Sequence, residues 1–126
     1  MLRHVAITVN RESDINRFYE GILGFSEVRR FILPDDLSDQ LFGISDATEV
    51  VLLNSGDIYL EVFLSERKIE PVYSHICISL QNRIDVMQKA ELNGYSVTIV
   101  ERTSKEDLVF LRDGTGNSFE LVEEPA

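Results

Sequence analysis

The sequence predicts an α+β fold built from two consecutive modules, each a strand followed by a helix and three more strands. Three observations indicate this fold. A stretch near the start, 3–9, is repeated in kind at 73–80, and both alternate apolar residues with small or polar ones. The only two histidines of the chain, His4 and His75, stand near the beginnings of these stretches. The helix and strand patterns that follow each stretch then come in the same order, so neither half can bury its apolar face alone.

The first module is predicted to cover about residues 1–66. Its helix can be capped by Ser13 and ended by Gly24 in a left-handed conformation. The apolar residues at helical spacing are Ile15, Phe18, Tyr19 and Ile22. Strands are expected at 2–9, 25–31, 49–54 and 58–64. The sequence at 54–57 is typical of the turn in a hairpin and joins the last two strands.

The second module is predicted to cover about residues 73–124, after a link at 67–72 that contains Pro71. Its strands are expected at 73–80, 96–102, 108–112 and 118–122. Between the first two strands, a helix at 83–93 should end at Gly94. The helix residues expected to face inward are Ile84, Met87 and Ala90. The last two strands should turn at 113–117.

The two modules differ in length because of an acidic stretch after Pro34. Glu61 follows His4 by 57 residues, whereas Glu120 follows His75 by 45. An insertion within 35–47 accounts for the difference and leaves the rest of the modules in register. This stretch has apolar residues at spacings that suit a short amphipathic helix: Leu37, Leu41, Phe42 and Ile44. A surface loop, a dimer contact and a lid over a cavity are the alternatives for its role.

Charge and composition exclude several classes of function. The chain has 12 basic and 22 acidic residues, a net charge of −10, so we expect no nucleic-acid partner. An anionic substrate would have to meet one of a few local cations: Arg3, Arg102, Lys105 or Arg112. The single cysteine, Cys77, is consistent with a reducing compartment. No apolar run approaches the roughly 20 residues of a membrane span, so we expect a soluble, cytoplasmic protein with no membrane partner.

Four side chains at repeat-equivalent strand positions predict a divalent metal site. Alternation places each histidine on the same face as small residues, which suits the wall of a cavity. Glu61 and Glu120 stand inside the apolar last strand of each module, where a glutamate needs a reason. Two imidazoles and two carboxylates form a mixed nitrogen and oxygen ligand set. The chain has one histidine besides His4, and the probability that it would fall by chance at the position equivalent to His4 in the repeat is about one in a hundred.

These residues resemble the vicinal oxygen chelate superfamily over nearly the whole chain. The family includes glyoxalase I, methylmalonyl-CoA epimerase, extradiol dioxygenases, fosfomycin-resistance thiol transferases and bleomycin-binding proteins. The features that carry the resemblance are His4, Phe18-Tyr19, Leu23-Gly24-Phe25, Ile58-Tyr59-Leu60-Glu61, His75, Asp113-Gly114-Thr115-Gly116-Asn117 and Phe119-Glu120-Leu121-Val122. The resemblance implies an open, curled mixed sheet with helices on its convex side and a metal on its concave side.

The order of the four residues is similar to that of the metal ligands in glyoxalase I. The resemblance therefore implies that His4, Glu61, His75 and Glu120 bind a divalent ion such as Ni, Co, Zn, Mn, Fe or Mg. Bleomycin binders lack such a ligand set. The dioxygenases and thiol transferases have a site of three ligands, His, His and Glu, so the fourth ligand, Glu61, distinguishes this chain from them. In this family the four ligands come from one chain or from two chains of a dimer, and we expect a homodimer.

The implied activity is that of a glyoxalase-like lyase or isomerase. A metal of this kind acts as a Lewis acid on a carbonyl oxygen, and Glu120, or Glu61 by the pseudo-symmetry, is the candidate base for the adjacent C–H. Thr8 stands where glutathione-using members carry an arginine, so we expect a carbonyl substrate other than the glutathione hemithioacetal of methylglyoxal. The alternatives are a methylmalonyl-CoA epimerase-like enzyme and a protein that sequesters a small ligand, as in antibiotic resistance.

Overall fold

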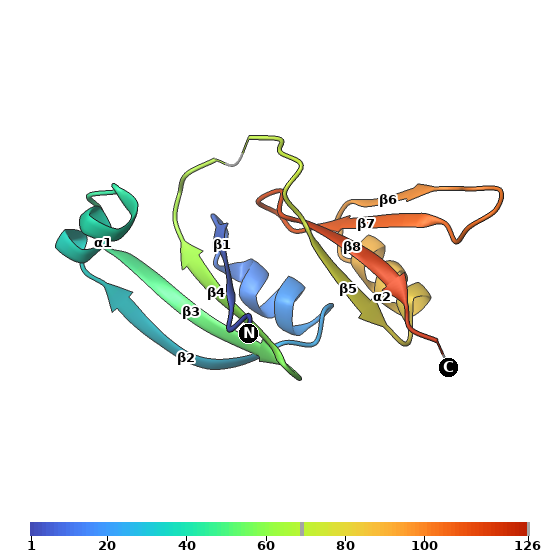
Figure 1. Ribbon diagram of the computed structural model, residues 1–126, viewed down its shortest axis with the longest axis horizontal. Coiled ribbons are helices and arrows are strands. Elements are labelled where there is room, and N and C mark those ends of the chain that lie inside the picture. The colour runs from blue at the N-terminus through green and yellow to red at the C-terminus, as the bar shows by residue number, and fades with distance from the viewer. Residues whose placement is uncertain (69, 126) are drawn as a thin grey trace. The chain divides into compact units, whose positions relative to one another are not determined.

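A computed structural model of the chain describes residues 1–68 and 70–125 (Figure 1). The chain divides into two compact units, Met1–Lys68 and Ile69–Ala126. The predicted link at 67–72 includes Ile69, which lies outside the described residues. Each unit has its own four-stranded mixed sheet, and the two sheets have the same strand order.

The order of elements confirms the predicted α+β fold of two strand–helix–three-strand modules. The first unit contains β1 (Val5–Val9), η1 (Ile15–Glu20), β2 (Ser26–Leu33), α1 (Asp35–Phe42), β3 (Thr48–Ser55) and β4 (Ile58–Leu64). The second contains β5 (Ile76–Leu80), α2 (Arg83–Leu92), β6 (Val97–Val100), β7 (Leu108–Arg112) and β8 (Ser118–Glu123). In each sheet the first strand of the unit runs parallel to the last, and the other neighbours are antiparallel. The short amphipathic helix predicted in the insertion is confirmed as α1.

The core of the first unit is built on one face of its sheet. Leu53 of β3 lies opposite Leu60 of β4, and Val51 lies opposite Val62. These four side chains are buried, as are Ile15, Phe18 and Tyr19 of η1. Burying a large apolar side chain contributes about 1.5–3 kcal/mol. The alternating pattern of β4 therefore leaves Glu61 on the opposite face of the sheet.

The first helix differs in detail from the prediction. It begins after Asp14 rather than Ser13, and the buried carboxylate of Asp14 pairs with Arg11 at 3.3 Å. Its backbone bonds join residues five apart, as in the 2.9 Å bond from the Gly21 N–H to the Asn16 carbonyl, which is a π-type turn. A Cβ at Gly21 would lie 2.8 Å from the Arg17 carbonyl oxygen, so the tight approach requires glycine.

The core of the second unit repeats this arrangement with one correction in the helix. The buried strand residues are Ile78, Val109, Leu111, Phe119 and Leu121. Ala90 of α2 is buried as predicted, but Ile84 is 66% exposed, so its prediction as an inward residue was wrong. Arg83 takes the inward place instead, since its backbone N–H donates to Glu123 and its guanidinium donates to the Leu121 carbonyl. The inward face of α2 thus begins one residue earlier than the sequence pattern indicated.

Gly94 directly follows the C-cap of α2, as predicted, whereas η1 already ends at Glu20, so Gly24, the predicted helix end, lies four residues beyond it, after a turn. Gly24 has φ +79° and Gly94 has φ +81°. This left-handed region is disfavoured for residues with a Cβ, so glycine is the natural choice where the chain turns from helix to strand.

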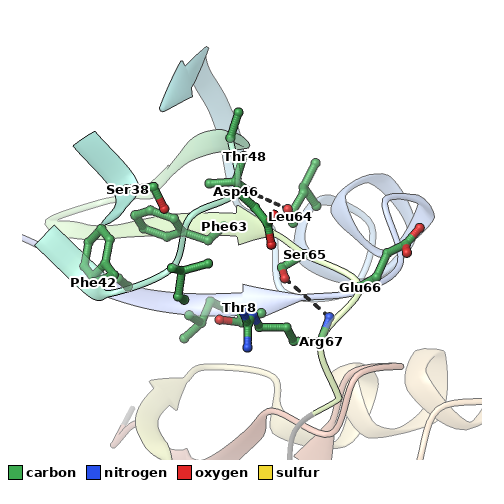
Figure 2. Close-up of a pocket in the computed structure, with 14 residues that line it drawn as sticks. Thr8, Ser38, Phe42, Asp46, Thr48, Phe63, Leu64, Ser65, Glu66 and Arg67 are labelled. Atoms are coloured by element: carbon green, nitrogen blue, oxygen red, sulfur yellow. Dashed lines mark hydrogen bonds between the residues drawn. The ribbon is translucent and has the colours of Figure 1, made fainter. Parts of the chain in front are cut away.

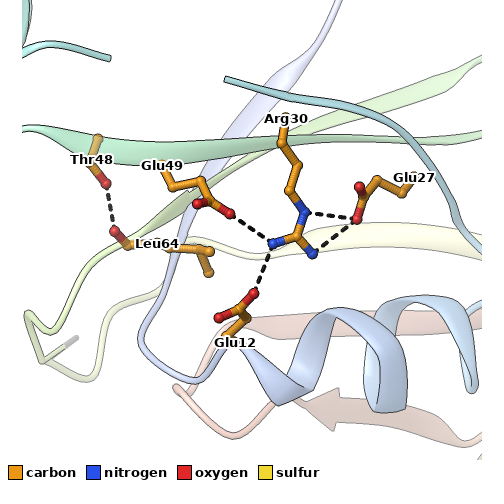
Figure 3. Close-up of polar contacts among 6 residues, drawn as sticks. All are labelled: Glu12, Glu27, Arg30, Thr48, Glu49 and Leu64. Atoms are coloured by element: carbon orange, nitrogen blue, oxygen red, sulfur yellow. Dashed lines mark hydrogen bonds and ion pairs between the residues drawn. The ribbon is translucent and has the colours of Figure 1, made fainter. Parts of the chain in front are cut away.

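A charged cluster ties the start of η1 to the sheet of the first unit (Figure 3). The Arg30 guanidinium donates to Glu12 and Glu49 at 2.8 Å each and to Glu27 at 3.0 Å. The three carboxylates raise the pKa of Arg30. The largest effect comes from Glu49 and the next from Glu12. Because Glu12 precedes η1 while Glu27 and Glu49 lie on β2 and β3, the cluster joins three separate segments.

Within residues 1–68 and 70–125, no helix combines the length and the apolar character that a membrane crossing requires.

Candidate metal centre

His4 and Glu61 meet on the open face of the first sheet. His4 directly precedes β1, and the parallel pairing of β1 with β4 sets Ala6 opposite Glu61. His4 Nε2 lies 3.4 Å from Glu61 Oε1. The side chains are 46% and 23% exposed, so both are accessible to a small ion. Two of the four predicted ligands, His4 and Glu61, therefore lie close together within one unit.

His75 and Glu120 form the equivalent pair in the second unit. His75 directly precedes β5, and Cys77 lies opposite Glu120 in the parallel pair of β5 and β8. His75 Nε2 lies 3.2 Å from Glu120 Oε1. The imidazole also packs against Phe110, with 5.2 Å between ring centroids. The same strand register thus produces the same pair twice.

The hydrogen bonding of His75 leaves its Nε2 suited to bind a metal. Nδ1 lies 2.9 Å from the carbonyl oxygen of Tyr73, and because a carbonyl only accepts, Nδ1 is the donor. In the neutral ring, Nε2 then carries a lone pair that faces the carboxylate of Glu120. The Nε2 lone pair and the Glu120 carboxylate can both bind the same cation. In metal-binding histidines the other ring nitrogen commonly donates to a backbone carbonyl, as Nδ1 does here.

The distances within the pairs also fit metal ligands. Two ligand atoms that each lie about 2.0–2.2 Å from one ion are about 3.0 Å apart at a right angle and about 3.4 Å apart in a tetrahedron. The observed separations of 3.4 Å and 3.2 Å fall in this range. Among the described residues of either unit, no group of three histidine, cysteine or acidic side chains comes together.

A buried carboxylate supports the strand that carries Glu120. Asp113 is 6% exposed and accepts hydrogen bonds from the backbone N–H groups of Thr115, Gly116 and Asn117, at 3.0, 2.8 and 2.8 Å. Its second oxygen accepts a bond from the Asn117 side-chain amide. The turn predicted at 113–117 is thereby confirmed, and its geometry fixes where β8 begins.

A cavity of about 840 Å³ lies between the sheet of the first unit and the α1 region (Figure 2). Its sheet side includes Ala6, Thr8 and Phe63, which share a face with Glu61. Its other side comes from α1 and the loop after it, including Phe42 and Ile44. The predicted insertion thus contributes one wall of this cavity, which of the roles considered for it is nearest to a lid. The sequence pattern identified α1 as amphipathic but could not indicate which surface it would contact.

The cations near the site are only partly those expected from the sequence. Arg112 shares the Glu120 face of its sheet, because it lies opposite Ser118, and its guanidinium donates to Thr98 at 3.4 Å. Arg102 instead donates to the backbone carbonyl of Glu106. Sequence reasoning missed Arg29, which lies opposite Leu52 on the Glu61 face, with its guanidinium 5.4 Å from the centroid of the Phe31 ring.

Cys77 shares the face of the second pair. Partial burial, and secondarily the negative charge of Glu120, raise the pKa of its thiol. A thiol in this environment remains protonated at neutral pH, where it is a poor nucleophile and a poor metal ligand.

Solved structures share the fold of this chain. A glyoxalase family protein from Enterococcus faecalis is 22% identical, with a TM-score of 0.72 over 96% of this chain and 95% of that chain. A glyoxalase family protein from Bacillus cereus is 18% identical, with a TM-score of 0.76 over 99% and 94%. A mutant of the fosfomycin resistance protein FosX from Listeria monocytogenes, complexed with Mn(II) and 1S,2S-dihydroxypropylphosphonic acid, is 14% identical, with a TM-score of 0.73 over 96% and 87%. These likenesses confirm the predicted fold.

Sequence comparison gives less. No protein-family model matches the chain. A stretch of 58 residues is 31% identical to the flagellar assembly factor FliW of Bdellovibrio bacteriovorus. This match covers 46% of the present chain and 33% of that protein, so the chain corresponds to about a third of its length.

Proposed function

We propose that this chain, which has the fold of the vicinal oxygen chelate superfamily, is a metal-dependent glyoxalase-like lyase or isomerase that moves a proton next to a carbonyl group. The observation that carries the proposal is the repeated pair: His4 with Glu61 at 3.4 Å and His75 with Glu120 at 3.2 Å. These four side chains would hold one divalent ion, supplied by both units of one chain or by two chains of a homodimer.

The chemistry of the site divides between the ion and the carboxylates. When bound, a divalent ion supplies Lewis acidity that stabilises the negative charge developing on a carbonyl oxygen as the adjacent C–H loses its proton. Glu120 lies between the buried side chains of Phe119 and Leu121, which fix its carboxylate on the open face of the sheet. Glu61 has the same support from Leu60 and Val62. Each carboxylate is thus positioned to accept a proton, and Glu120 is the proposed base.

The proposed substrate is a small carbonyl compound other than the glutathione hemithioacetal. Thr8 lines the cavity of the first unit, and it stands at the position where the resemblance to glutathione-using members would place an arginine. A neutral hydroxyl binds a carboxylate more weakly than a bidentate guanidinium does. We expect kcat/KM for the hemithioacetal below the usual efficient range of roughly 10⁴ to 10⁸ M⁻¹s⁻¹. A value inside that range would overturn this part of the proposal.

Solvent-deuterium exchange tests the proposed reaction directly. With metal bound, the protein should exchange the α-proton of a hydroxy-carbonyl or acyl-thioester compound. Glu120→Gln should retain the metal, because an amide oxygen still coordinates, but should lose exchange, because an amide does not accept the proton. Glu61→Gln is the matched variant in the other pair. If Glu120→Gln exchanges as fast as wild type while Glu61→Gln does not, Glu61 is the base.

One observation favours a second function, the sequestration of a small ligand. The cavity of about 840 Å³ is in the size range of drug-binding pockets. A sequestering protein would bind its ligand without exchanging any ligand proton, and binding would survive removal of the metal. Exchange and binding measured on the same compound therefore separate the two functions.

A further inference from the structure

One side of the cavity in the first unit comes from α1, and the described part of the second unit has no equivalent helix between β6 and β7. The two sheets have equivalent strands and equivalent histidine–glutamate pairs. The connection between β2 and β3 contains α1, whereas β6 and β7 are joined by the shorter stretch 101–107. The wall that α1 supplies is therefore an addition to one module. The residues that line the cavity beside it indicate which kind of ligand this module can bind.

Two aromatic rings define the apolar part of this cavity. Phe42 at the end of α1 meets Phe63 of β4 edge to face, with 5.4 Å between ring centroids (Figure 2). Phe63 lies two residues after Glu61 on the same strand face, a spacing of about 7 Å. Ile44, Ala47 and Leu64 add further apolar surface. Glu61 is not part of the lining, so only a ligand that extends beyond Phe63 along β4 would meet its carboxylate.

The polar groups of the cavity disfavour an anionic occupant. Thr48 donates its hydroxyl to the Leu64 carbonyl, so this O–H is used within the protein. The hydroxyl oxygen of Ser65 accepts the Arg67 N–H. Asp46 and Glu66 place two carboxylates in the lining against one guanidinium, that of Arg67. The net charge of −10 adds to this negative potential.

We propose that the cavity under α1 is a specificity site that binds an uncharged aromatic or branched apolar group, with Phe42 as the residue that determines this preference. Its assignment as the site for the non-reacting end of the substrate rests on the proposed function. The binding preference itself does not require a metal.

Two related dyes provide the test. N-Phenyl-1-naphthylamine is neutral, and 8-anilino-1-naphthalenesulfonate has the same aromatic skeleton with a sulfonate. On metal-free protein, the neutral dye should bind with one site per chain, and the sulfonate should bind about tenfold more weakly because of the nearby carboxylates. Equal binding of the two dyes, or binding at several equal sites, would overturn the proposal.

Variants on α1 locate the dye. Phe42→Ala should weaken binding of the neutral dye about threefold to tenfold, since an aromatic contact is lost. Leu41→Ala is the matched control, because Leu41 is 60% exposed and lies outside the cavity lining. Asp46→Asn should strengthen binding of the sulfonate while leaving that of the neutral dye unchanged. Equal effects of Phe42→Ala and Leu41→Ala would place the dye elsewhere and refute the assignment.

A metal-site variant separates this inference from the proposed function. His75→Ala removes a proposed ligand in the other unit and should not change dye binding. If the dye binds as described but no metal is held in wild type, the cavity stands and the proposed function fails. If wild type holds metal but Phe42→Ala does not change dye binding, the proposed function stands and the cavity proposal fails.

Discussion

Replacing Asp113 with alanine should destabilise the second unit more than any exposed carboxylate replacement. Its carboxylate accepts three backbone N–H groups at 2.8–3.0 Å and one side-chain amide at 2.8 Å, and the residue is 6% exposed. Hydrogen bonds to a charged group contribute about 1.5–3 kcal/mol each, but water can reach part of this turn and the four bonds are not independent. We therefore expect the free energy of unfolding to fall by about 2–4 kcal/mol.

Urea unfolding measures this loss, with two further variants as controls. Asp113→Asn keeps one acceptor oxygen but presents an amide to the Asn117 amide, so it should lose about half as much. Asp107→Ala removes an exposed carboxylate from the same unit and should change the free energy of unfolding by less than about 0.5 kcal/mol. The slope of the free energy against urea concentration should stay constant. If Asp113→Ala is as stable as Asp107→Ala, the turn does not hold β8 in the way described.

Two further predictions concern the charged groups. Arg30→Met should lower the free energy of unfolding by about 1–2 kcal/mol, because three carboxylates lose their shared cation, and this loss should be smaller in about 0.5 M salt. Arg29→Met, on the opposite face of the sheet, is the control. A loss that does not depend on salt would argue against an electrostatic cause. Because burial and Glu120 raise the pKa of Cys77, its alkylation by iodoacetamide in metal-free protein should rise at higher pH than that of N-acetylcysteine, and Glu120→Gln should move the midpoint down. A midpoint in wild type at or below that of N-acetylcysteine would contradict the second prediction.

The sequence was most informative where one strand face is buried and the other is not. Alternation along 58–64 separates Leu60 and Val62 from Glu61, and in the structure the two apolar residues are buried while Glu61 lies on the other face. A one-residue shift would exchange the two faces, so such a pattern fixes register strongly. The sequence singled out His4, Glu61, His75 and Glu120 as one ligand set without assigning pairs, and the structure brings each histidine to the glutamate of its own module.

The details that the sequence did not predict depend on contacts between segments or on local irregularities. The bulge between Glu27 and Arg29 shifts the register of β2, and this shift turns Arg29 toward the Glu61 face. Arg83 displaces Ile84 from the inner face of α2 because carbonyl and carboxylate acceptors from β8 are available to it. The cavity under α1 depends on Phe42 meeting Phe63 across 21 residues of chain, which no periodicity indicates.

Metal stoichiometry tests the central claim most directly. After loading with a divalent ion and removal of the excess, elemental analysis of wild type should give about one ion per chain. His75→Ala should lose most of this metal, because the Nε2 that faces Glu120 is gone. His4→Ala should do the same if both pairs serve one ion. Equal, substoichiometric metal in wild type and in both variants would mean that the two pairs do not form a metal site.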